Sequence, residues 1–223
     1  AAEAKERNLE GWVVTLQYPS MSPFMMYSSN RELKEKLWKA YNTRAFGGEF
    51  DNSKIVEEIA DTRLQVARLL GYDTYADYVL EERMAESAPT VNAFLTELLD
   101  RAIGAAHADV KSVAEYAAAN GFTGELMPWD FSYYSEKLKN EKYSINEELT
   151  KPYFKLENVQ KGVFDLATRL YGITFKEVNN IPLYHPEVKT YEVYDNDGSF
   201  LAVLYTDFFP RESKGGGAWM TQF

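Results

Sequence analysis

Apolar residues recur every three or four positions through most of residues 30–171, which is the period of an amphipathic α-helix. Polar or proline residues that can begin a helix precede each apolar stretch in the first half. The pattern predicts a helix over 31–43 capped by Asn30, a helix after Asn52 or Ser53 that ends at Gly71, a short helix after Asp73, and a long helix from near Pro89 to near Asn120.

The period changes near residue 172. A further helix is expected over 158–171, closed by Gly172, and three strands are expected over 173–175, 190–194 and 200–208. Asn196-Asp197-Gly198 predicts a tight hairpin between the last two strands, because Asn/Asp-Gly pairs supply positive φ angles. A strand over 11–16 is also expected.

The expected fold class is therefore mainly α (α+β), with a small antiparallel β element near the C-terminus. The expected division is a helical body over residues 1–172 followed by a β-containing segment over 173–223, together forming one continuous folded unit. We interpret both ends of the chain as truncated: the first residues have the pattern of the last turns of a helix, and the last residues lie in an apolar stretch without a closing element.

Composition excludes several classes of protein. The 223 residues include 24 Lys and Arg against 34 Asp and Glu, a net charge of −10, whereas a protein that tracks nucleic-acid phosphates carries a basic excess. No apolar run reaches the roughly 18 residues needed to span a bilayer. The absence of Cys excludes disulfides, iron–sulfur clusters and Cys-bound zinc. It suits the cytoplasm and is compatible with the periplasm.

The two histidines do not form a metal motif. No His-Glu-x-x-His pentad occurs, and His107 and His185 lie far apart in the sequence. We interpret His107 as a surface residue of the long helix and His185 as a residue whose hydrogen bonds fix the loop around Pro186. A third hypothesis is a hydrolase built on His185, but no Gly-x-Ser-x-Gly elbow is present to supply its nucleophile.

An aromatic run follows the long helix. Trp129, Phe131, Tyr133 and Tyr134 can line a ligand groove, or they can pack in a core or an interface. The residues by themselves leave both readings open, and they supply no complete catalytic set.

Several stretches, in one order along almost the whole chain, resemble family M3 of the zinc metallopeptidases. This is the group of thimet oligopeptidase and oligopeptidase A, and the likeness is nearest to its peptidyl-dipeptidase (dipeptidyl carboxypeptidase) branch. The stretches are Asn30-Arg31-Glu32-Leu33, Tyr41-Asn42-Thr43-Arg44-Ala45, Arg68-Leu69-Leu70-Gly71-Tyr72, Tyr75-Ala76-Asp77-Tyr78, Met84-Ala85, Pro128-Trp129-Asp130, Tyr133-Tyr134, the run 151–159, the run 184–188, the run 205–212 and Gly216-Gly217-Ala218-Trp219-Met220.

The resemblance implies a zincin-like, largely helical enzyme with a deep channel for short peptides, from which the peptidyl-dipeptidase branch releases C-terminal dipeptides. The family's zinc-binding helix follows the Gly-Gly-Ala-Trp segment, and this sequence ends at Phe223 before it. The resemblance therefore implies zinc in the intact enzyme, no metal ligand and no catalytic residue in this chain, an inactive fragment, and the remaining C-terminal half of the same polypeptide as its partner. Candidates for the channel wall are Trp129, Tyr133, Tyr134 and Arg211.

A competing hypothesis from another class is a helical module that binds peptides or protein partners without catalysis. The fragment hypothesis differs from it by predicting newly uncovered apolar surface where the missing C-terminal half packs.

Overall fold

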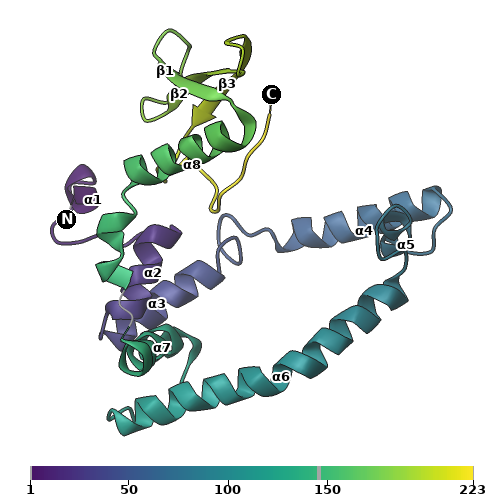
Figure 1. Ribbon diagram of the computed structural model, residues 1–223. Coiled ribbons are helices and arrows are strands. Elements are labelled where there is room, and N and C mark those ends of the chain that lie inside the picture. Colours follow the sequence, from purple (N-terminus) through teal and green to yellow (C-terminus); the bar gives the residue numbers. More distant parts are fainter. Residues whose placement is uncertain (1, 145–146, 223) are drawn as a thin grey trace. The chain divides into compact units, whose positions relative to one another are not determined.

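The computed structural model describes residues 2–144 and 147–222. Its contacts group the chain into two compact units, Ala1–Lys142 and Tyr143–Phe223, and each is described by itself. The elements are α1 (Ala2–Glu6), α2 (Tyr18–Tyr27), α3 (Arg31–Asn42), α4 (Ser53–Leu69), α5 (Tyr75–Leu80), α6 (Ala88–Ala119), α7 (Pro128–Tyr143), the 3₁₀ turns η1 (Glu147–Leu149) and η2 (Lys151–Tyr153), α8 (Leu156–Tyr171), β1 (Thr174–Val178), β2 (Lys189–Tyr194) and β3 (Phe200–Thr206) (Figure 1). The fold class is mainly α with a small antiparallel sheet near the C-terminus, as the sequence predicts.

The predicted starts of α3 and α6 are confirmed, whereas Asn52, a predicted cap of α4, makes no side-chain hydrogen bond to that helix. The Asn30 side chain accepts a hydrogen bond from the Leu33 N–H at 3.0 Å and begins α3. The Ser87 side chain caps α6, which carries Pro89 in its first turn and ends at Asn120. The predicted cap Asp73 is wrong by one residue: Thr74 caps α5, because its hydroxyl and the Asp77 carboxylate can satisfy each other's backbone N–H groups.

The segment before α3 differs from the prediction. Residues 11–16 form no strand in the described part of the chain, and the sequence analysis missed α2 altogether. Pro19 stands in the first turn of α2, where its missing N–H costs nothing, but Pro23 lies inside the helix. Because proline is the least favourable residue inside a helix, helix propensity did not predict α2, which has two prolines in ten residues.

The second unit is a three-stranded sheet covered on one face by α8. The strand order is β1-β2-β3 and both pairs are antiparallel, with Phe175 opposite Val193. The predicted hairpin is confirmed: Gly198 has a φ of 82°, and the Asp197 carboxylate accepts from the Ser199 N–H at 2.8 Å. The ring of Phe164 on α8 stacks on Phe175 with centroids 4.1 Å apart.

The change from helix to strand occurs at Gly172, which ends α8 in the left-handed conformation with a φ of 75°. Contacts nevertheless group α8 with the sheet that it covers, in the unit beginning at Tyr143. The division into a helical body over 1–172 and a β-containing segment therefore stays a prediction.

Two helices of the first unit, α4 and α6, carry apolar residues that no described residue of that unit covers. In α4 only Ala67 is fully buried, while Ile55, Val66 and Leu69 are exposed. Long stretches of α6 are exposed as well, and its buried residues are Val113 and Ala117 near the C-terminal end. A helix face of this composition is stable when another element covers it.

Candidate functional site

The aromatic candidates Trp129, Tyr133 and Tyr134 lie on α7, where they meet α3. The centre of this contact is Asp130, whose side chain is 1% exposed. Arg31 donates to both carboxylate oxygens of Asp130, from Nε to Oδ1 at 3.0 Å and from Nη2 to Oδ2 at 2.9 Å. The Met127 N–H donates to Oδ2 at 3.1 Å, so Asp130 also holds the first turn of α7. Its carboxylate thus ties α3 to the start of α7.

Cations cover the aromatic rings of this contact. The Lys34 ammonium lies 4.3 Å from the Tyr133 ring centroid, and the Lys137 ammonium lies 4.4 Å from it. The Lys39 ammonium lies 5.6 Å from the Trp129 ring. Burial lowers the pKa of Lys34, which is an almost fully buried residue.

The rings also contact one another. Trp129 meets Trp38 edge to face with centroids 5.6 Å apart, and Tyr134 contacts both Tyr133 and Phe122. Trp129 is buried, and its indole N–H has no hydrogen-bond partner in the described part of the chain. Tyr133 and Tyr134 are half-buried. The three residues therefore come together in the packing of α3 on α7, and a role in binding substrate stays a prediction.

The fourth candidate, Arg211, lies in the second unit, in the loop after β3. Its guanidinium makes two parallel hydrogen bonds to Asp207, at 2.9 and 2.8 Å. Lys214 lies 2.8 Å from the same carboxylate, and the Tyr184 hydroxyl donates to it at 3.1 Å. The hydrogen bonds from Arg211, followed by those from Lys214 and Tyr184, hold the pKa of Asp207 far below its usual value. Arg211 thus closes the loop 207–214, and a role in the channel wall stays a prediction.

The histidines lie in different settings. His107 is exposed on α6, as expected. His185 is half-buried, and its Nδ1 accepts from the Glu187 N–H at 3.3 Å, in keeping with a role in fixing the loop. Within residues 2–144 and 147–222, no three His, Asp or Glu side chains gather where a metal ion can bind. A catalytic zinc needs three protein ligands, so these residues do not fit the zinc that the resemblance implies for the intact enzyme.

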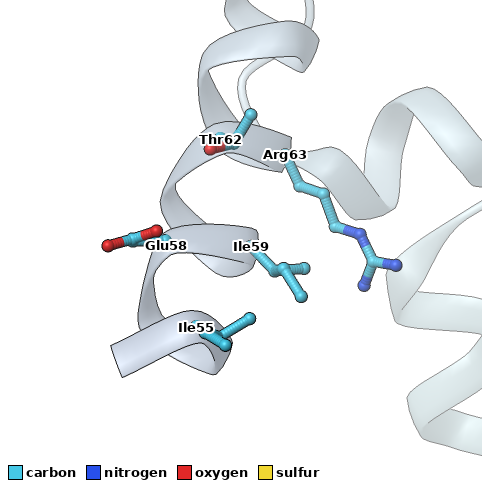
Figure 2. A pocket seen from close by; sticks show the side chains of 5 residues that line it. All are labelled: Ile55, Glu58, Ile59, Thr62 and Arg63. Atoms are coloured by element: carbon cyan, nitrogen blue, oxygen red, sulfur yellow. The ribbon is translucent and has the colours of Figure 1, made fainter. Parts of the chain in front are cut away.

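A hollow of about 280 Å³ lies on α4 and is lined by Ile55, Glu58, Ile59, Thr62 and Arg63. Figure 2 shows Ile59 and Arg63 on the same side of α4, with Glu58 projecting from the other side. The Arg63 guanidinium lies 5.4 Å from the Tyr75 ring centroid of α5 and is thus already engaged. The hollow is an open apolar surface without a converging set of titratable groups.

A groove of about 500 Å³ lies between α8 and the first two strands. Gln160 donates to the Tyr191 hydroxyl at 2.5 Å, and this hydroxyl donates to Glu177 at 3.4 Å. Lys189 pairs with Glu177 at 3.2 Å. This polar cluster was not predicted: the first strand was expected to end at residue 175, whereas β1 continues to Val178 and places Glu177 directly opposite Tyr191.

No helix in the described ranges combines the length and the apolar character needed to cross a membrane.

Comparisons with known proteins cover the whole chain. Oligopeptidase A of Escherichia coli (strain K12) is 41% identical over 224 residues, which are 98% of this chain and 33% of that protein. Dipeptidyl carboxypeptidase of Salmonella typhimurium is 36% identical over 229 residues, 100% of this chain and 33% of that protein. Saccharolysin of Saccharomyces cerevisiae is 29% identical over 227 residues, 96% of this chain and 31% of that protein.

The chain thus spans about a third of the length of these relatives. The family model described as Peptidase family M3 matches residues 24–223, nearly all of the sequence. The chain belongs to peptidase family M3.

Proposed function

We propose that this chain is the non-catalytic part of a zinc metallopeptidase that hydrolyses short peptides and releases dipeptides from their C-termini. The metal ligands are supplied by residues outside the chain, and the chain by itself does not cleave peptides. The main support is the match to the M3 family over residues 24–223, combined with the lack of a metal-binding group in the described ranges.

The names of the relatives support the substrate class. An oligopeptidase acts on short peptides, and a dipeptidyl carboxypeptidase removes dipeptides from the carboxyl end. Relatives of both names match nearly the whole chain, at 41% and 36% identity. The two activities differ in their products, so the product of cleavage has to be identified to choose between them.

Within this enzyme, the chain builds part of the wall of a peptide channel. Trp129, Tyr133, Tyr134 and Arg211 contribute to the wall by shape and packing, since neighbouring side chains already engage each of them. The catalytic step itself depends on groups that these 223 residues do not provide.

The test compares the full-length polypeptide with the 223-residue chain. The full-length protein should bind zinc and lose activity to a chelator, and the chain alone should do neither. One tight zinc per 223-residue chain in equilibrium dialysis, together with peptide cleavage, would overturn the proposal.

Dipeptide release has its own control. A short synthetic peptide with a free C-terminus should lose its last two residues, as read by mass spectrometry, and the same peptide with an amidated C-terminus should be cut poorly. Equal cleavage of both peptides at internal bonds would contradict dipeptide release and leave the peptidase assignment intact.

A further inference from the structure

Helix α6 ends in a glycine cap that contains the only Asn-Gly pair of the sequence, Asn120-Gly121. The Gly121 N–H donates to the Ala118 carbonyl at 3.1 Å, and the Phe122 N–H donates to the Ala117 carbonyl at 3.0 Å. These two hydrogen bonds form a Schellman motif, in which the residue after the cap is left-handed. Gly121 has a φ of 84°, and both residues of the pair are exposed. The cap thus places a glycine directly after an exposed asparagine.

An asparagine followed by glycine is open to a reaction with its own backbone. The Gly121 nitrogen loses its proton to solvent and bonds to the Asn120 Cγ atom; the Cγ–Nδ2 bond breaks, and Nδ2 takes a proton from solvent and leaves as ammonia. Water then opens the succinimide ring. Cleavage of the new N–Cγ bond gives aspartate, and cleavage between the nitrogen and the backbone carbonyl carbon gives isoaspartate. Glycine favours the ring closure, because it has no side chain to hinder the approach of its nitrogen.

The closed cap opposes this reaction at both reacting groups. The attacking nitrogen is the one whose hydrogen is bound to the Ala118 carbonyl. The Asn120 Nδ2 group donates to the Tyr116 carbonyl at 2.9 Å, which holds the side-chain amide back along the helix. Ring closure therefore requires the last turn of α6 to open.

We propose that Asn120 is a site of spontaneous deamidation in the folded protein, and that opening of the α6 cap sets its rate. Helix ends open locally at a free-energy cost well below that of global unfolding, so the reactive form is sampled in the folded state. The products weaken the cap. The succinimide nitrogen has no hydrogen for the Ala118 carbonyl, and an aspartate at position 120 places a negative charge at the negative end of the helix.

The ring of Phe122 connects the cap to the packing of α7. Its centroid lies 5.3 Å from that of Tyr134, and the Arg31 guanidinium lies 5.6 Å from it. Because the Phe122 N–H is one of the two donors of the cap, these contacts of the ring favour the closed form. Removing the ring should raise the rate of deamidation without changing the reacting pair.

The full-length protein is incubated in heavy-oxygen water at mildly alkaline pH, and peptide mass spectrometry measures the rate at each asparagine. The heavy oxygen marks deamidation that precedes digestion. Asn42 is the matched control: its Nδ2 also donates to a carbonyl four residues earlier, that of Trp38 at 2.8 Å, at the end of α3, but Thr43 follows it. In the folded protein, Asn120 should react faster than Asn42 and about tenfold more slowly than in the urea-unfolded chain.

Two variants test the role of the cap. Phe122→Ala should raise the folded-state rate at Asn120 roughly threefold or more, because it removes packing that keeps the cap closed. Phe94→Ala replaces the same residue type in the first half of α6, where the side chain is 60% exposed, and should leave that rate unchanged. In urea, both variants and the wild type should react equally fast.

A folded-state rate at Asn120 no higher than that at Asn42, or equal to the rate in urea, overturns the proposal. It also fails if Phe122→Ala leaves the folded-state rate unchanged or if both variants raise it equally. None of these measurements uses zinc content or peptide cleavage, so their failure is distinguishable from a failure of the proposed function.

Discussion

The ion pair between Arg31 and Asp130 makes the sharpest prediction about stability. The Asp130 side chain is 1% exposed and the Arg31 side chain is 46% exposed, and the two residues are joined by three hydrogen-bond contacts. Arg31→Met keeps most of the apolar stem but removes the charge. It leaves the buried carboxylate with the Met127 N–H as its remaining hydrogen-bond donor among the described residues.

The expected loss follows from burial. Removing one partner of a fully buried pair costs about 3–5 kcal/mol. Because Arg31 is half-exposed, solvent already screens part of the attraction, and we expect a loss of about 2 kcal/mol in the free energy of unfolding. Arg101→Met is the matched control: Arg101 pairs with Glu97 on α6, both side chains are mostly exposed, and the expected loss is about 0–0.5 kcal/mol.

Equilibrium urea unfolding, followed by tryptophan fluorescence, measures these losses, since Trp38 and Trp129 pack together beside the ion pair. Asp130→Asn combined with Arg31→Met should cost less than the sum of the two single changes, because the uncompensated carboxylate is gone. Strict additivity, or a loss for Arg31→Met no larger than for Arg101→Met, would refute this account of the α3–α7 contact.

Three further predictions concern the loop 207–214, the hairpin turn at Gly198 and the cap of α5. Asp207→Asn should speed limited proteolysis of the loop 207–214. Because the pKa of Asp207 is lowered in the folded chain, the stabilisation of the loop by the ionised carboxylate is fully present above about pH 4 and is lost only in stronger acid. A loss of this stabilisation already complete near pH 6 would contradict the prediction. Gly198→Ala, at a φ of 82°, should cost about 1 kcal/mol and raise amide exchange in β2 and β3; unchanged exchange would count against strain at this turn. Thr74→Ala should cost about 1 kcal/mol and fray α5, whereas Asp73→Ala should change little, as amide exchange of α5 will show.

Local chemistry explains the elements that were predicted well. Asn30 caps α3 through a residue three positions away, and Asn196-Asp197-Gly198 turns the chain within its own hairpin. Such interactions lie within a few residues, so their donors, acceptors and φ angles can be inferred from the sequence alone. Asp73 and Thr74 are both residue types that can cap α5, and the three-residue spacing from Thr74 to Asp77 identifies Thr74 as the cap. This spacing was the signal that was overlooked in the sequence.

The candidate site was harder to predict, because its partners are distant in the sequence. Trp129 and Tyr133 were singled out for their composition, yet their neighbours Arg31, Lys34 and Trp38 lie about 100 positions earlier. No periodicity encodes such a pairing. For the same reason the cluster of Gln160, Glu177 and Tyr191 was missed: it forms only when α8 lies on the sheet.

The amino-acid order alone determined most of the helical periods, the Asn30 cap, the hairpin at Asn196-Asp197-Gly198 and the likeness to the M3 peptidases. Only the tertiary structure decided which apolar stripes are covered and which ring or carboxylate meets which cation. The physical reason is the separation in sequence of the residues that interact. A helical period or a turn depends on neighbours within a few residues, whereas burial and ion pairing depend on residues that are distant in the sequence and meet only in the fold. Helix α8 shows both levels: the three- and four-residue spacing of its apolar residues can be read from the sequence, whereas the stacking of Phe164 on Phe175 is known only from the fold.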